Sequence, residues 1–467
     1  MSHHRSSRRV LACICAAIVL SVVTATTATA GAAQRSQGAW SRAYAGTTLH
    51  FIGEATLNTQ IMQKLLPDFQ KKTGINVVVE QAPYDSLVQK AVLDFAAHKG
   101  NYDVLSIPYE YLGSYAEKKY IEPDVLSGAT DDKLGYKASD IIPALWKASS
   151  DWKGHVYGAP SNSAVMMMFY RKDLFSNAAE QTAFKKRYGY ALAPAKTWKQ
   201  YRDIAQFFTR KSGQMLAGKK LSSNFYGLTI AGKRHVATVL EYFNYAWTNG
   251  GGFFTPKGQV ALDSPGNLKG LEYEIGLTAF APAAYTTTTW DEMTAAFQQG
   301  TIAEAIAWGD TAGGMEDPSA SKVVGKVGYA SIPVVQAGQK PIAHLGSWTY
   351  SVNADSGNKA ASALFIKWAL SKDVQTKLAA MGGLPALTSV FKDPDLVAKL
   401  PYWRQELTSL SQAKSRPRIP QWGAIADILQ DDLSRALAKS TTPQKALADA
   451  QTRVEGALKG ALPVTYQ

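Results

Sequence analysis

Strand-like and helix-like segments alternate through the first part of the chain, and this alternation limits the fold more than any other feature. Residues 48–52 and 75–79 read as short strands, with helical apolar spacing over 61–73 between them. A helix over 84–98 and a strand over 102–107 repeat the cycle. Such alternation predicts an α/β fold in which helices flank a mostly parallel sheet.

From about residue 160 the pattern suggests a second body, and the chain is long enough for two domains. Strands are expected at 163–170, 226–230, 302–307, 327–332 and 348–352, and helices at 198–211, 265–278, 293–299, 360–370, 372–381, 422–438 and 443–458. We detect no internal repeat.

The N-terminal segment has the pattern of an export signal. Arginines precede an apolar run over 10–23, and Ala28-Thr29-Ala30 resembles a cleavage site. The run is about fourteen residues, shorter than the ~20 that a membrane-spanning helix needs. Residues 1–30 are therefore predicted to be a signal peptide and 31–46 a flexible tether. The general secretory and the twin-arginine routes both remain open.

Cysteine content and charge exclude several classes of protein. Cys13 and Cys15 both lie inside the apolar run, so no disulfide is expected after cleavage, and Cys13 comes too early for lipid attachment. The formal charge of +13 is scattered, and Lys185-Lys186-Arg187 is typical of its short clusters. No nucleic-acid partner is predicted, because basic residues form no helix or block.

Several short motifs, in this order, resemble the extracellular solute-binding proteins of bacterial ABC importers, particularly the sugar-binding, maltose-binding-protein-like family. They are residues 69–77 (FQKKTGINV), 102–104 (YDV), 154–160 (GHVYGAP), 169–175 (FYRKDLF), 197–201 (TWKQY), 363–368 (ALFIKW) and 382–385 (GGLP). Together they span most of the chain after the signal segment. Arg171 departs from the asparagine usual in this family.

The resemblance implies two α/β lobes, each a mostly parallel sheet flanked by helices, joined by hinge crossovers. The implied N-terminal lobe is 47–158 with 308–355, and the C-terminal lobe 159–307 with 356–467. It also implies an exported, monomeric, non-catalytic receptor without a cofactor or metal. Such a receptor would capture a sugar, oligosaccharide or sugar alcohol by hinge closure and deliver it to the permease subunits of an ABC importer.

Candidate ligand-binding residues follow predicted strands or begin predicted helices, where open α/β sheets place their binding crevices. A sugar needs polar groups for its hydroxyls and flat rings for its C–H faces. The candidates are Glu54, Tyr109, Glu110, Asn162, Trp290, Trp308, Asp310, Gly346, Trp348 and Trp422. The tryptophans and the two glutamates also have a competing structural interpretation, in which the tryptophans cap a lobe or staple a helix start and the glutamates face a helix N-terminus.

Two other functions remain open. Acidic and aromatic loops would also suit a receptor for a polyamine, whereas an iron chelate or phosphorylated polyol would call for clustered cations. A glycoside hydrolase needs two carboxylates across one cleft, and Glu54 with Glu110, or Asp310 with Glu304, can be nominated. The sequence has no nucleophile elbow, metalloprotease motif or phosphate loop, which disfavours an enzyme.

Overall fold

The computed structural model describes residues 40–127 and 134–464, so the predicted signal peptide at 1–30 lies outside the described residues. The described end of the predicted tether meets the domain: the Gly46 N–H donates to the Gly74 carbonyl at 2.9 Å. In the part of the chain that the structure describes, we find no helix with the length and apolar character needed to cross a bilayer.

The first sheet has five strands, in the order β2 (Asn76–Ala82), β1 (Thr48–Glu54), β3 (Val104–Pro108), β13 (Trp348–Val352) and β6 (Ala159–Pro160). Strand β1 pairs in parallel with β2 and β3, as the predicted alternation requires. Strand β13 is antiparallel to both of its neighbours, β3 and β6. It returns to this sheet from far along the chain.

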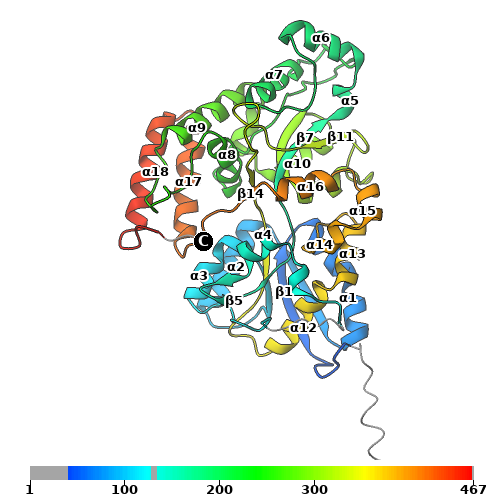
Figure 1. Ribbon diagram of the computed structural model, residues 1–467, viewed down its shortest axis with the longest axis vertical. Coiled ribbons are helices and arrows are strands. Elements are labelled where there is room, and N and C mark those ends of the chain that lie inside the picture. The colour runs from blue at the N-terminus through cyan, green and yellow to red at the C-terminus, as the bar shows by residue number, and fades with distance from the viewer. Residues whose placement is uncertain (1–39, 128–133, 465–467) are drawn as a thin grey trace, which may run out of the picture. The chain divides into compact units, whose positions relative to one another are not determined.

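Helices cover both faces of this sheet (Figure 1). On one face lie α1 (Leu57–Thr73) and α12 (Lys359–Ala369), where the Phe365 ring lies 5.7 Å from Phe51 and 5.5 Å from Phe69. On the other, Ile52 and neighbouring strand residues pack against α2 (Tyr84–Ala96) and α3 (Leu112–Glu117). Because side chains alternate along a strand, Phe51 and Ile52 enter different cores.

The second sheet has the order β10 (Glu304–Trp308), β7 (Met166–Arg171) and β11 (Val327–Ala330). Both outer strands run antiparallel to β7, which differs from the mostly parallel pairing predicted for this lobe. Parallel pairing occurs there as single bridges, Thr197 with Val334 and Tyr226 with Ile302. The chain enters this sheet by a crossover from β6 and leaves it toward β13.

The other elements complete the two lobes. The remaining helices are α4 (Pro143–Ser149), α5 (Lys172–Phe175), α6 (Ala178–Tyr188), α7 (Trp198–Phe208), α8 (Val236–Thr248), α9 (Pro265–Leu277), α10 (Trp290–Gln298), α11 (Ala312–Met315), α13 (Lys372–Ala380), α14 (Thr388–Phe391), α15 (Pro394–Lys399), α16 (Trp403–Leu410), α17 (Trp422–Leu437) and α18 (Pro443–Ala457). Short strand pairs are β4 (Asp151–Trp152) with β5 (His155–Val156), β8 (Met215–Leu216) with β9 (Lys219–Lys220), and β12 (Ala343–His344) with β14 (Ala413–Lys414).

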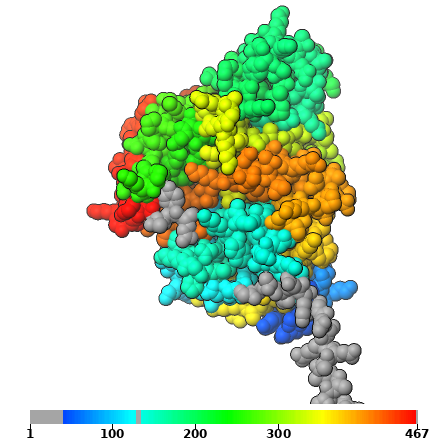
Figure 2. Space-filling model, viewed as in Figure 1, coloured from blue at the N-terminus to red at the C-terminus, as the bar shows by residue number. Residues whose placement is uncertain are grey.

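Two lobe boundaries differ from the predicted ones. Helices α12 and α13 pack with α1 and belong to the first lobe, although 356–467 was assigned to the second. Strand β11 pairs in the second sheet, although 308–355 was assigned to the first. The chain therefore crosses again after α14, and the orange segment with α15 and α16 lies between the green and cyan parts of the surface (Figure 2).

Two predicted features of the second lobe are also corrected. Residues 226–230 form no regular strand, because Gly227 packs its backbone directly on α7: a Cβ there would lie 2.0 Å from the Ala205 carbonyl oxygen. Helix α8 was not predicted. All its residues are buried, and it packs against α9 and α17 in the second lobe. A helix that is buried on every side lacks the single apolar stripe that marks a surface helix.

Candidate ligand-binding site

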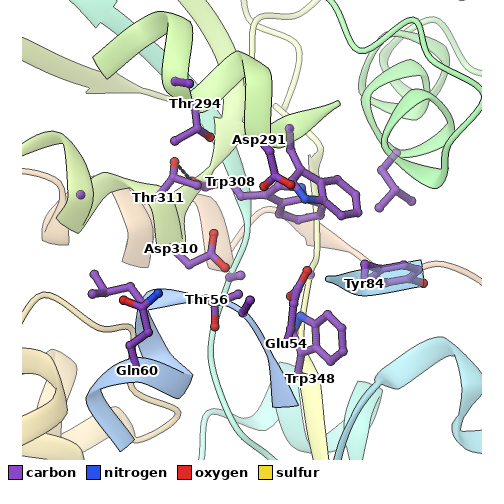
Figure 3. Close-up of a pocket in the computed structure, with 18 of the residues that line it drawn as sticks. Glu54, Thr56, Gln60, Tyr84, Asp291, Thr294, Trp308, Asp310, Thr311 and Trp348 are labelled. Carbon is purple, nitrogen blue, oxygen red and sulfur yellow. Dashed lines mark hydrogen bonds between the residues drawn. The ribbon is translucent and has the colours of Figure 1, made fainter. Parts of the chain in front are cut away.

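A cavity of about 370 Å³ lies between the two lobes, at the ends of the strands that carry the predicted site (Figure 3). Strand β1 ends there at Glu54, β3 at Pro108 and β10 at Trp308. This position agrees with the rule that open α/β sheets place their crevice beyond strand ends.

The first lobe contributes the turn from β1 into α1 and the start of α2. Thr56 is the N-cap of α1, and its hydroxyl accepts from the Thr59 N–H. Gln60 lies one turn further along and also lines the cavity. Tyr84, the first residue of α2, has its ring 5.7 Å from Trp290 and 5.6 Å from Trp348, both edge to face. This side therefore offers an aromatic wall beside hydroxyl and amide groups.

The second lobe contributes α10, whose start is fixed by a capping box. The Glu292 carboxylate accepts from the Thr289 N–H at 2.7 Å, and the Thr289 hydroxyl accepts from the Asp291 N–H. Capping boxes fix the first turn of a helix. Trp290 in that turn lines the cavity. Asp291 in the same turn and Thr294 in the next face the cavity from above the first-lobe groups in Figure 3.

The third wall comes from the crossovers. The Thr311 hydroxyl donates to the Trp308 carbonyl at 2.8 Å in the turn that carries Asp310. Gly346 is required opposite, because a Cβ there would lie 2.4 Å from the Trp308 indole. The Trp348 N–H donates to the Asn162 side-chain oxygen at 3.1 Å. Backbone contacts thus hold the two indoles at the hinge side of the cavity.

The acidic groups of the cavity influence one another. Burial, and then the carboxylates of Asp310, Asp291 and Glu110, raise the pKa of Glu54 well above its usual value. Burial likewise raises the pKa of Asp310 to about 6, against opposing backbone hydrogen bonds, and Asp291 adds to the increase. The pKa of Asp291 is also raised, mainly by burial. Removing water disfavours the charged carboxylate, and like charges add to this effect.

Six predicted site residues line the cavity: Glu54, Trp290, Trp308, Asp310, Gly346 and Trp348. The four others do not line it. Glu110 is fully buried, with its Oε1 3.0 Å from the Arg416 Nη1, and the hydroxyl of the buried Tyr109 accepts from the Arg416 N–H at 2.7 Å. Asn162 is buried and holds Trp348 as described above, and Trp422 is fully buried with its ring 5.6 Å from Phe253.

Sequence reasoning did not select several polar or aromatic groups on the cavity wall. These are Thr56, Gln60, Tyr84, Thr294, Gln298, Thr311 and Arg416. Tyr84 follows the end of β2, so the strand-end rule could have found it. Arg416 lies far along the chain, in a segment with no predicted element, and no local pattern points to it.

Among residues 40–127 and 134–464, no cluster of three or more histidine, cysteine, aspartate or glutamate side chains is arranged to hold a metal ion. Rings line the cavity together with oxygen and nitrogen groups, a combination that is typical of sites for organic solutes.

Comparison with known proteins agrees with this architecture. The family model of the bacterial extracellular solute-binding proteins matches residues 55–376. The chain belongs to this family. Members of the family are receptors of ABC importers, and the ABC transporter solute-binding protein of Agrobacterium radiobacter, solved in complex with ribitol, is similar in sequence and fold. It is 28% identical, with a TM-score of 0.78 over 88% of this chain and 99% of that one.

Two further relatives show the same resemblance. The solute-binding protein of Agrobacterium vitis, solved with bound D-mannitol, is 27% identical, with a TM-score of 0.76 over 89% of this chain and 99% of that one. The mannitol-binding protein of Pseudomonas aeruginosa is 25% identical over 86% of this chain and 89% of its own length. The predicted family and two-lobed fold are therefore confirmed.

Proposed function

We propose that this protein is an exported, non-catalytic receptor that captures a sugar or sugar alcohol between its lobes and delivers it to an ABC importer. The observation that carries the proposal is the cavity itself, which combines three indoles with carboxylate, amide and hydroxyl groups. Rings suit the apolar C–H face of a polyol, and the polar groups suit its hydroxyls. Relatives that bind ribitol and mannitol support this ligand class.

Capture follows from the division of the wall between two lobes. Glu54 and Gln60 come from the first lobe, whereas Trp290 and Asp291 come from the second. A solute contacts both sets only when the lobes are together, so binding shifts the protein toward the closed conformation. The proposed partners are the membrane-spanning subunits of an importer, which would dock the closed form of a monomer.

Neither nominated hydrolase pair favours catalysis. Glu110 pairs with Arg416 behind the wall, and Glu304 is fully buried within β10. Of these carboxylates, Glu54 and Asp310 line the cavity. A hydrolase would convert the bound glycan, so incubation of protein with a stabilising oligosaccharide should release no new reducing ends. Steady product release would overturn the non-catalytic assignment.

A thermal-shift panel of sugars, sugar alcohols, phosphorylated polyols and polyamines tests the ligand class, because a ligand that binds only the folded state raises its melting temperature. We expect shifts with carbohydrates or polyols. Trp290→Ala should lower the affinity for these ligands at least about tenfold and reduce the thermal shift accordingly, as expected for loss of a buried aromatic contact. Trp146→Ala is the matched control, because Trp146 lies on α4 away from the cavity. A panel answered by simple polyamines alone would refute the proposal.

A further inference from the structure

The cavity has an unusual charge balance for a site that receives an uncharged guest. Four carboxylates line it: Glu54, Asp291, Asp310 and Asp317. Arg416 is the one arginine or lysine among the described lining residues, and its guanidinium already faces the buried Glu110 carboxylate at 3.0 Å. Acidic side chains therefore outnumber basic ones at this site, although the chain as a whole carries a net charge of +13.

A further acidic side chain lies behind the wall. Glu406 is fully buried with both of its oxygens unpaired, and one of them lies 1.8 Å from where a Cβ of Gly309 would be, directly before Asp310. The Asp310 charge raises the Glu406 pKa further after burial has done so. Lys233 and His235 partly offset the Asp291 charge, whereas Glu54 is influenced by burial and by other carboxylates.

A neutral ligand would add no charge to compensate the carboxylates of the cavity. It would displace water from Glu54, Asp291 and Asp310. Its hydroxyl groups would then donate hydrogen bonds to these carboxylates but would supply no positive charge. An ammonium group supplies both hydrogen bonds and charge, because it carries three N–H donors and a full positive charge. The rings of Tyr84 on the first lobe and Trp290 on the second also favour a cation over their faces.

We propose that the ligand carries a positively charged amino group on a hydroxylated body of sugar size, as in an amino sugar or an amino polyol. This inference rests on the proposed function and narrows its substrate class. The ammonium group would lie among Glu54, Asp291 and Asp310, which Figure 3 shows converging on the cavity from opposite walls.

The neutral groups of the cavity distinguish this ligand from a simple polyamine. Thr56 and Gln60 on the first lobe, with Thr294 and Gln298 on the second, line the same space and suit ligand hydroxyls. A methylene chain between two amines would leave these groups without partners, which is costly once water is excluded. One amine with several hydroxyls uses both sets of groups.

The direct test is calorimetric titration of the purified protein with matched ligands that differ in one group. The first pair is sorbitol and 1-amino-1-deoxysorbitol, and the second is glucose and glucosamine, with each N-acetyl derivative as an uncharged amide control. We expect the amine of at least one pair to bind about tenfold or more tightly than its hydroxyl and N-acetyl counterparts.

The outcomes separate the two proposals. If a neutral sugar or polyol binds as tightly as its amine in both pairs, or more tightly, this inference fails and the proposed function stands. If no sugar, polyol or amino derivative binds at all, the proposed function fails, and this inference fails with it.

Proton exchange gives an independent readout. Near pH 6, where Asp310 titrates, a bound ammonium group favours ionised carboxylates, so binding should release protons. A neutral ligand that dehydrates the same groups should instead take protons up. Titrations in two buffers of different ionisation enthalpy measure the sign. Net uptake on binding of the amine would overturn the inference.

A charge-removing variant links the preference to the acids. Asp310→Asn should reduce the affinity for the amine about tenfold more than it reduces the affinity for the neutral counterpart. Asp395→Asn removes the same charge at an exposed site on α15, far from the cavity wall, and should leave the preference unchanged. An equal loss of both ligands in Asp310→Asn would contradict a charge-based preference.

Discussion

At the scale of single residues, Glu110 and Arg416 form a buried ion pair next to the cavity. Both side chains are buried, and the Tyr84 hydroxyl also donates to Glu110 Oε1 at 3.0 Å. Glu110→Ala leaves the Arg416 charge buried without a partner, so we expect the free energy of unfolding to fall by about 3–5 kcal/mol in urea titrations. Asp449→Asn is the control, because its pair with Lys445 at 2.8 Å lies on the solvent-facing side of α18, where an ion pair contributes little to stability. Similar losses in the two variants would contradict this assignment.

The same pair shows how far residue-level prediction reached. The strand-end rule correctly located Glu54, Trp308 and Asp310 at the cavity. It could not tell which way side chains turn after a strand: Tyr109 and Glu110 enter a 3-10 turn directly after β3, and both point into the protein. That direction depends on Arg416, more than 300 positions away, which no local pattern reveals.

At the scale of elements, close backbone packing explains what the sequence could not predict. The apolar run at 226–230 has strand composition, yet Gly227 lies against α7 and leaves no room for a side chain. Gly227→Ala should therefore lower the free energy of unfolding by at least about 1–3 kcal/mol through overpacking, measured by denaturant titration. Gly276→Ala, in α9 with open space around its Cβ position, should instead stabilise by about 0.4–1 kcal/mol. Two variants of equal stability would refute the packing argument.

Helix capping allows a second test at this scale. Thr289→Ala removes the cap that orients Trp290 and Asp291 in the first turn of α10. We expect a loss of about 1 kcal/mol in stability together with weaker ligand binding. Thr442→Ala removes the equivalent cap of α18, where the Thr442 hydroxyl accepts from the Lys445 N–H. It should cost similar stability without changing affinity by calorimetry. Unchanged affinity in Thr289→Ala would show that the cap does not position the site.

At the scale of the whole molecule, the two lobes touch at the mouth of the cavity. His235, the N-cap of α8 in the second lobe, has its Nε2 3.5 Å from the Asp85 carboxylate of α2 in the first. The Trp290 ring lies 4.7 Å from the His235 ring, edge to face. The predicted two-lobed architecture is confirmed, but no pattern in the sequence predicts the contact between His235 and Asp85. These two side chains are close only because the folded lobes bring α2 and the start of α8 together.

This contact predicts a dependence of lobe closure on pH. Burial lowers the pKa of His235 below its usual 6.5; Lys233 adds to the decrease, whereas Asp85, Asp291 and Glu292 oppose it. The Tyr84 ring of the first lobe, 6.3 Å from the His235 ring, contributes to this burial. We therefore expect separation of the lobes to raise the histidine pKa toward its usual value, although it also removes Asp85. The stabilising contribution of His235 is therefore complete above about pH 6.5 and is lost as the pH falls through the lowered pKa.

We expect the radius of gyration of the ligand-free protein, measured by small-angle X-ray scattering, to increase between pH 7.5 and pH 5 as the lobes separate. His235→Asn keeps an acceptor for the Ala237 N–H that the histidine now caps, yet cannot take up a proton. This variant should show a smaller increase over the same range. The carboxylates of the cavity titrate in both proteins, so their effect cancels in the comparison. Identical pH profiles would assign the response to those acids, because the histidine is the one titrating group that the two proteins do not share.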